Sequence, residues 1–297
     1  MSEAPRDAAS ERIKHVTRAA DIADGEFGQI GNVLITPNRA SGRVLVMFNG
    51  AIPRDKMRDE PFFQRWTWSH LFDATVIFVS DPAVSVSNDI RLGWYIGKQK
   101  GWSLTSLLAT VRGHIDALVT DPEIICFGSS GGGFAAIQAA LHGWCDRAIA
   151  INPQTNVLEF APQFVRRIRG YYESDTGQFE PADMDRVSVL EHLKRRGELP
   201  VPVRIFQNFY DREHYEKHLL PLLDQVSALP EASRYRLQVS LFLERALEHS
   251  PPSRELTVRM IHEAAPQVIH GRGLRLIAKF NAETAAAHIA APAAQPA

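Results

Sequence analysis

Short runs of apolar residues recur along the chain, and longer segments with helical spacing separate them. The runs are RVLVMF (43–48), TVIFV (75–79), EIICF (123–127), RAIAI (147–151), VRIF (203–206) and LQVSLFL (237–243). Most of them lack regular polar alternation, which indicates strands that are covered on both faces. GNVLITP (31–37) is a further candidate, which we expect to form an earlier edge strand.

The segments between these runs carry apolar residues on one face of a helix. In 103–118 they occupy positions 104, 107, 108, 111, 115 and 118, which is helical spacing. Residues 131–142, 215–227 and 251–264 are further helical candidates. Strands that alternate with helices predict an α/β fold, with a mostly parallel central sheet and helices on both of its faces.

Composition divides the chain into three parts. We predict an N-terminal arm over 1–26, one α/β domain over 27–280 and a disordered Ala/Pro-rich tail over 281–297. The stretch from the strand that ends at 151 to the one that begins at 203 is too long for a simple crossover. It predicts a helical lid insertion at about 156–200.

Charge and cysteine content exclude several classes of protein. The 297 residues contain 33 Lys and Arg against 34 Asp and Glu, so we expect no nucleic-acid partner. Cys126 and Cys145 lack the spacing of a metal site or a disulfide framework. No signal-peptide pattern and no run of about 18 apolar residues is present. We expect a cytoplasmic protein without membrane span, metal or organic cofactor, and the pattern indicates no particular oligomeric state.

A cluster of glycines follows the run EIICF and precedes an alanine-rich helical segment. Gly128, Ser130 and Gly132 form the pattern G-x-S-x-G. In a strand-to-helix turn of this kind the glycines allow close packing, and the central serine is exposed as a nucleophile. A phosphate-binding loop would need a lysine that is absent, and Ser129 would fit the pattern only if Phe127 were glycine. Ser130 is therefore the predicted nucleophile.

A nucleophilic serine needs a base, and the base needs an acid that orients it. For an α/β sheet with such a turn, the expected order along the chain is serine, acid, histidine. Asp211 follows the run VRIF, and His249 follows the run LQVSLFL, so both lie where strands end. We therefore predict that Ser130, Asp211 and His249 form a catalytic triad.

Other side chains compete for these roles. His214 and His218 closely follow Asp211 and are rival bases, while Asp224 is a rival acid that lies within a helical segment. The spacing of the two histidines is also compatible with two metal ligands on a helix, although no Glu follows His214 as in H-E-x-x-H. We expect His214 to line the pocket.

An acyl-transfer site also needs two N–H groups for the negative oxygen of its intermediate. The backbone N–H of Gly131, directly after the predicted nucleophile, is one candidate. The run RVLVMF leads into Asn49-Gly50-Ala51, and the N–H of Ala51 is the second candidate, with a simple Asn-Gly turn as the alternative. Asn49 and Asp81 also follow strands and are candidates for the pocket wall, although Asp81 is equally suited to cap a turn or helix.

The glycine-rich turn, the order of Ser130, Asp211 and His249, and the loop FNGA (48–51) resemble the α/β-hydrolase superfamily over nearly the whole ordered chain. Asn49 stands where many members have histidine, which leaves the chemistry of the oxyanion hole less well defined. More weakly, VSDPAVSVSNDIRLGWYIG, GSSGGGFAA and AINPQT are similar to bacterial hydrolase-like proteins associated with surface-polysaccharide synthesis and accessory secretion.

These resemblances imply a serine hydrolase that cleaves a carboxylic ester through an acyl-enzyme on Ser130. The substrate would be a small-molecule or glycan acyl compound. A transferase that passes an acyl or acetyl group to a glycan or small-molecule acceptor is one alternative. A catalytically silent accessory protein that binds a partner or glycan is another.

Overall fold

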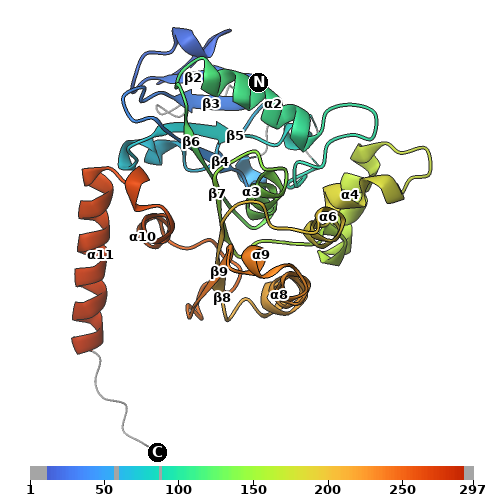
Figure 1. The fold of residues 1–297 in the computed structure, drawn as a ribbon. Helices are drawn as coiled ribbons and strands as arrows, with labels where there is room; N and C mark the ends of the chain where they lie inside the picture. The colour runs from blue at the N-terminus through green and yellow to red at the C-terminus, as the bar shows by residue number, and fades with distance from the viewer. Residues whose placement is uncertain (1–11, 57–59, 87–88, 291–297) are drawn as a thin grey trace, which may run out of the picture.

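A computed structural model of the chain describes residues 12–56, 60–86 and 89–290, and its centre is a nine-stranded sheet (Figure 1). The strands are β1 (Ile13–His15), β2 (Phe27–Ile30), β3 (Val33–Thr36), β4 (Arg43–Phe48), β5 (Thr75–Val79), β6 (Glu123–Ser129), β7 (Arg147–Ile151), β8 (Val203–Asn208) and β9 (Leu237–Phe242). Their order is β1-β2-β3-β5-β4-β6-β7-β8-β9. β3 pairs antiparallel with β2 and β5, and the other pairs are parallel. The predicted mostly parallel sheet is confirmed.

The strand expected at an early edge lies inside the sheet. β3 corresponds to GNVLITP, and its four residues are all buried between β2 and β5. The edge strand is instead β1, and β2 lies between it and β3; both are short and partly polar and carry little strand signal. At the opposite edge, β9 pairs only with β8 among the described strands, and its residues are half-buried or exposed.

Helices connect most of the parallel strands. They are α1 (Pro82–Ser85), α2 (Leu104–Asp116), α3 (Gly131–Leu141), α4 (Pro162–Tyr172), α5 (Met184–Val187), α6 (Val189–Arg196), α7 (Arg212–His214), α8 (Leu220–Ser227), α9 (Glu231–Arg234), α10 (Arg254–Ala264) and α11 (Gly271–Ala290). Short 3-10 helices are η2 (Ala19–Asp21), η3 (Arg54–Lys56), η4 (Trp66–Leu71), η5 (Val157–Glu159), η6 (Pro181–Asp183) and η8 (Pro266–Val268), and η7 (Tyr215–Leu219) is a π-helical turn. Over the described ranges, no helix is both long and apolar enough to cross a membrane.

The helices cover both faces of the sheet, as predicted (Figure 1). On one face α2, α3, α4, α6 and α8 share a core, to which they contribute Leu108, Phe134, Ile168, Leu193 and Leu222. On the other face α10 and α11 pack around a second core, which contains Phe127, Val258, Ile261 and Ile277. Every residue of α3 is buried, and its Gly and Ala residues allow this helix to lie close to the sheet.

The segment between β7 and β8, where the sequence predicts a lid insertion at about 156–200, contains helices. It comprises η5, α4, η6, α5 and α6. Apolar side chains on these helices, among them Ile168, Tyr172 and Leu193, are buried in the same core as α3. The insertion therefore packs against the sheet-covering helices and belongs to the body of the domain.

Both ends of the chain are more ordered than the composition predicted. Within the expected arm, Ile13–His15 pairs with β2, and Ala19 and Ile22 are buried. Within the expected tail, α11 continues to Ala290, consistent with the high helix propensity of alanine. Residues 291–297, the rest of the predicted tail, lie outside the described residues.

Candidate active site

Ser130 lies in the turn between β6 and α3, at the C-terminal edge of the parallel strands. Its backbone has φ 55° and ψ −123°, a conformation that residues other than glycine rarely adopt. Its N–H donates to the carbonyl of Ile151 at 2.9 Å, and its own carbonyl accepts from Phe134 N at 3.1 Å. These two bonds tie the strained turn to β7 and to the first turn of α3.

Gly128 and Gly132 allow the strand and the helix to meet at this turn. A Cβ atom on Gly128 would lie 2.1 Å from the carbonyl carbon and oxygen of Gly132. A Cβ atom on Gly132 would lie 2.4 Å from the carbonyl oxygen of Phe48. In each case the obstacle is backbone, which cannot rotate away as a side chain could. The two glycines are therefore required by close packing of the backbone.

The variant Gly128→Ala is expected to lower the free energy of unfolding by about 3 kcal/mol, the upper end of the usual range for overpacking. The matched control is Gly113→Ala in the middle of α2, where an added Cβ meets nothing within 4 Å. That change should raise stability by about 1 kcal/mol, because alanine favours the helix. Urea denaturation measures both, and equal stability of the two variants would contradict this account of the turn.

Asp211 and His249 come from the loops that follow the last two strands. Asp211 lies beyond β8 and caps α7, and His249 lies between β9 and α10. His249 Nδ1 is 2.6 Å from Asp211 Oδ2, and His249 Nε2 is 3.1 Å from Ser130 Oγ. The three side chains that the sequence singled out therefore form one hydrogen-bonded series from carboxylate to hydroxyl.

A buried amide holds the loop that carries His249. Asn208 is fully buried at the end of β8, and its Nδ2 donates to the carbonyls of Glu244 and Glu248 at 2.9 Å each. Its Oδ1 accepts from Glu244 N at 3.1 Å. Glu248 has a left-handed φ of 46°, so the chain turns sharply just before His249. Asn208, which the sequence analysis missed, thus fixes both ends of the segment that positions His249.

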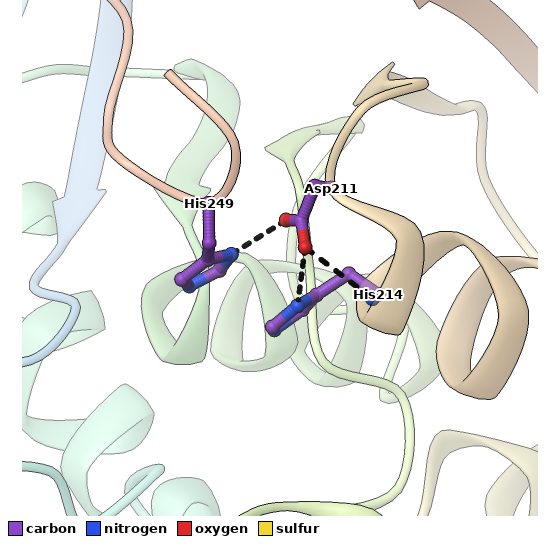
Figure 2. A group of neighbouring side chains, drawn as sticks. All are labelled: Asp211, His214 and His249. Atoms are coloured by element: carbon purple, nitrogen blue, oxygen red, sulfur yellow. Dashed lines mark hydrogen bonds and ion pairs between the residues drawn. The ribbon is translucent and has the colours of Figure 1, made fainter. Parts of the chain in front are cut away.

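His214 contacts the second oxygen of Asp211 (Figure 2). Its Nδ1 is 3.0 Å from Asp211 Oδ1, and its ring stacks on that of His249 with centroids 3.8 Å apart. Burial alone would raise the pKa of Asp211, but the hydrogen bonds from the two histidines outweigh it and hold the pKa well below its usual value. Asp211 is therefore ionised at neutral pH and accepts from both rings.

Gln154 connects His214 to Ser130 and was not predicted as a site residue. It follows β7 and is fully buried. Its Nε2 lies 2.8 Å from Ser130 Oγ and 2.7 Å from His214 Nε2. Its Oε1 accepts from Trp94 Nε1 at 3.2 Å and lies 3.2 Å from Ser130 Oγ. The one signal in the sequence was its place just past the C-terminal end of a parallel strand, where side chains reach the site.

The loop after β4 lies against the turn that carries the nucleophile. A Cβ atom on Gly50 would lie 3.7 Å from Ser130 Cβ. Gly50 N donates to Gln64 Oε1 at 3.0 Å, and Gln64 Nε2 donates to the carbonyl of Ala51 at 3.0 Å. Neither bond uses the N–H of Ala51. Gly131 is the first residue of α3, so its N–H has no acceptor within the helix. Gly131 therefore directly follows Ser130, and Gly50, the neighbour of Ala51, approaches it; the N–H groups of Ala51 and Gly131 remain the predicted oxyanion donors.

Asn49 and Asp81, which the sequence predicts for the pocket wall, are both buried and hydrogen-bonded to backbone. Each side chain is 3% exposed. Asn49 Oδ1 accepts from Gln64 N at 2.9 Å. Asp81 caps α1 by accepting from Ala83 N at 3.0 Å, and it accepts from Tyr95 N at 2.8 Å. Burial raises the pKa of Asp81 to about 6, although backbone N–H groups partly oppose the rise. Both side chains therefore stabilise the backbone of neighbouring segments.

The rival nucleophile, base and acid make other contacts. Ser129 Oγ accepts from Arg65 Nη2 at 2.8 Å. His218 Nδ1 accepts from Thr155 N at 3.3 Å, and burial, followed by the proximity of His214, lowers the pKa of His218 to about 3. Asp224 is exposed on α8. These contacts leave His249 as the histidine that reaches Ser130.

Asp211, His214 and His249 also have ligand atoms within 4.8 Å of one another, close enough to be considered for a metal ion. The two imidazole planes differ by only 12° and are stacked. Their in-plane lone pairs therefore run side by side and do not converge on one point, as a tetrahedral site requires. The arrangement fits a shared carboxylate between two N–H donors better than a metal centre.

Several solved structures are similar to this chain. The capsule O-acetyltransferase of Neisseria meningitidis serogroup A is 15% identical, with a TM-score of 0.55 over 80% of this chain and 94% of that one. The acylaminoacyl peptidase of Pyrococcus horikoshii is 13% identical, with a TM-score of 0.54 over 80% of this chain and 40% of that one. The Glycosylation Associate Protein (Gap123) complex of Streptococcus agalactiae is 13% identical, with a TM-score of 0.51 over 79% of this chain and 45% of that one.

No family model and no curated protein matches the sequence. The likeness to solved structures therefore concerns the arrangement of strands and helices. In this chain that arrangement is a mostly parallel sheet covered by helices on both faces, with a serine turn after β6. The resemblance found in the sequence and the likeness found in the structure agree: this chain has the α/β-hydrolase fold.

Proposed function

We propose that the chain is a serine hydrolase that cleaves a carboxylic ester through an acyl-enzyme on Ser130. The observation that carries the proposal is the series from Asp211 through His249 to Ser130, with contacts of 2.6 and 3.1 Å. Nucleophile, base and orienting acid need these contacts for serine catalysis. The strained backbone of Ser130 adds the geometry of a nucleophile turn.

In the first half of the reaction, Ser130 Oγ attacks the acyl carbon of the ester. His249 Nε2 takes the hydroxyl proton, and Asp211 keeps the Nδ1 proton on the far side of the ring and stabilises the imidazolium. The N–H groups of Ala51 and Gly131 receive the negative charge on the tetrahedral intermediate. His249 then returns the proton to the leaving alcohol, and the C–O bond to that alcohol breaks.

In the second half, water attacks the acyl-enzyme. His249 takes a proton from the water molecule, a second tetrahedral intermediate forms, and the same two N–H groups hold its oxygen. Collapse of this intermediate releases the carboxylic acid, and the proton on His249 returns to Ser130 Oγ. His249 therefore acts as base and as acid once in each half.

An acyltransferase that uses the same residues is the second candidate. The observation that favours it is the match to the capsule O-acetyltransferase, which covers 94% of that chain and has also been solved with CoA as an H228A mutant. In this version an acetyl group passes to Ser130 and then to a hydroxyl of a glycan or small molecule, which takes the place of water. The chemistry at Ser130, His249 and Asp211 is otherwise the same.

A fluorophosphonate probe tests the shared chemistry. We expect wild-type protein to react, with the adduct located on Ser130 by mass spectrometry. The variant Ser129→Ala should react as fast as wild type, because Ser129 faces Arg65, whereas Ser130→Ala should not react. Folded wild-type protein that fails to react, or an adduct on another residue, would contradict both the hydrolase and the transferase and favour a silent binding protein.

The acceptor separates the two enzymes. A hydrolase should release acid from p-nitrophenyl acetate at a rate that glycan acceptors do not change. A transferase should release CoA from acetyl-CoA only when an acceptor with free hydroxyl groups is present, and the acetyl group should appear on that acceptor. Steady release of acetate without any acceptor would exclude the transferase as the main activity.

A further inference from the structure

The amide of Gln154 has a direction that its partners fix. Trp94 Nε1 can only donate, so the atom of Gln154 that faces it at 3.2 Å must be the carbonyl oxygen. The NH₂ group then faces Ser130 Oγ at 2.8 Å and His214 Nε2 at 2.7 Å, with one hydrogen for each. Gln154 is fully buried, and both of its hydrogens are used.

This direction also fixes the tautomer of His214. Because Gln154 Nε2 donates to it, His214 Nε2 must carry a lone pair and no proton. The proton of a neutral ring is then on Nδ1, which donates to Asp211 Oδ1 at 3.0 Å. From Trp94 through Gln154 and His214 to the carboxylate of Asp211, each donor therefore faces an acceptor.

We propose that Gln154 and His214 form a positioning pair, which aims the hydroxyl of Ser130 at His249 and keeps the second oxygen of Asp211 occupied by a neutral N–H donor. The proposal rests on the proposed function and assigns two residues to it beyond the triad. Ser130 Oγ receives a hydrogen from Gln154, so its own proton points to an acceptor. His249 Nε2 at 3.1 Å is the basic acceptor, whereas Gln154 Oε1 at 3.2 Å already accepts from Trp94 Nε1.

His214 cannot itself act as the base in this arrangement. Its Nε2 lone pair is already engaged by Gln154. Burial is the largest cause and lowers the pKa of His214, and the proximity of His249 lowers it further. The hydrogen bond to Asp211 and the charges of Asp211 and Glu213 raise it but do not outweigh burial. The centroid of the His218 ring lies 5.0 Å from that of His214. His214 therefore stays neutral beside His249, and His249 alone takes the serine proton.

The first test replaces the amide by an apolar side chain of similar size. Gln154→Leu removes the donor to Ser130 and is expected to lower kcat by about 10²-fold with little change in KM, the size of effect that a small misplacement of a reacting group causes. The matched control is Gln138→Leu on α3. Gln138 is also buried and also contacts a buried histidine, with its Oε1 2.6 Å from His192 Nδ1. This control should keep kcat and the rate of probe labelling within about twofold of wild type.

The second test separates the two contacts of His214. His214→Asn places an N–H near Asp211 Oδ1 but loses the acceptor for Gln154 and the ring that stacks on His249. His214→Phe keeps a stacked ring but removes the donor to Asp211. Asp211 would then keep only His249 as a ring N–H donor, and we expect the acid limb of the kcat/KM profile to move to higher pH. In His214→Asn the limb should stay in place while kcat falls. A merely structural role would lower activity in both variants without moving the limb.

Nitrogen NMR of the histidine rings tests the pair without any activity. We expect His214 of the full chain to carry a proton on Nδ1 and none on Nε2 from about pH 6 to 8. Gln154→Glu should place a proton on Nε2, because a carboxylate there can only accept. A proton on Nε2 of His214 in wild type would overturn the pair whether or not the protein is an enzyme. If Ser130 reacts with the probe but Gln154→Leu matches wild type in rate, the proposed function stands and the pair fails.

Discussion

Asp211→Asn is expected to lower kcat/KM by about 10⁴-fold, the size of effect that the loss of an orienting carboxylate has in serine enzymes. In this chain the carboxylate accepts from two rings, with His249 Nδ1 on Oδ2 and His214 Nδ1 on Oδ1. Asparagine offers one oxygen and one NH₂, so one histidine must give up its N–H donation. If His249 turns its lone pair to the NH₂ group, its proton moves to Nε2, and it can no longer accept from Ser130.

The matched control for this variant is Asp224→Asn. Asp224 was the rival acid in the sequence, but it is exposed on α8, so its replacement should leave kcat/KM within about twofold of wild type. Thermal unfolding of both variants separates loss of activity from loss of fold. Full activity of Asp211→Asn with p-nitrophenyl acetate would mean that the contact at 2.6 Å does not orient a catalytic base.

Much of the fold could be predicted because buried parallel strands have a distinctive sequence. The six runs from RVLVMF to LQVSLFL correspond to β4 through β9, and the segments between them contain the expected helices. The short strands β1 and β2 escaped notice because neither has the length or apolar character that identifies a strand without its partners. Their neighbour β3 was then placed at an edge that it does not occupy.

The residues of the site also fall into two groups. Those with a reactive group could be predicted from the sequence, and those that only orient a reactive group could not. Ser130, Asp211 and His249 could be singled out because each follows a strand and each has chemistry of its own. Gln154 follows a strand and Asn208 ends one, but an amide acquires a role only through the direction it adopts and the partners it meets. Asp81 shows the reverse, since a carboxylate at a strand end turned out to cap a helix.

Acid should destabilise the fold before most carboxylates titrate, because several buried histidines are neutral in the folded chain. Burial lowers the pKa of His218 to about 3 and that of His192 to about 4, from 6.5 in the exposed state. Between pH 6.5 and the lowered pKa values, the unfolded chain binds protons that the folded chain does not. The contribution of these neutral histidines to stability is therefore complete above pH 6.5 and is lost as the pH falls. At about pH 4.5 each of these histidines should lower the free energy of unfolding by about 2.5 kcal/mol.

Asp81 acts in the opposite direction. Its pKa is raised to about 6, so the folded chain takes up a proton there before the unfolded chain does, and stability rises by about 2 kcal/mol as the pH falls to about 4.5. Because the two histidines together outweigh this gain, urea denaturation should show a net loss of about 3 kcal/mol between about pH 7.5 and 4.5. A flat or rising curve over this interval would contradict the neutral state of the buried rings.

A single substitution identifies the source of the loss. His218→Asn keeps an acceptor for Thr155 N in place of Nδ1, which is 3.3 Å away, and removes the titrating group. We expect its stability to fall by about 2.5 kcal/mol less than that of wild type over the same interval. The control His70→Asn replaces an exposed histidine in the same way, so a change of slope confined to His218→Asn identifies the buried ring. If both variants keep the wild-type slope, then His218 is not the group that resists protonation, and the acid loss must come from the other buried rings.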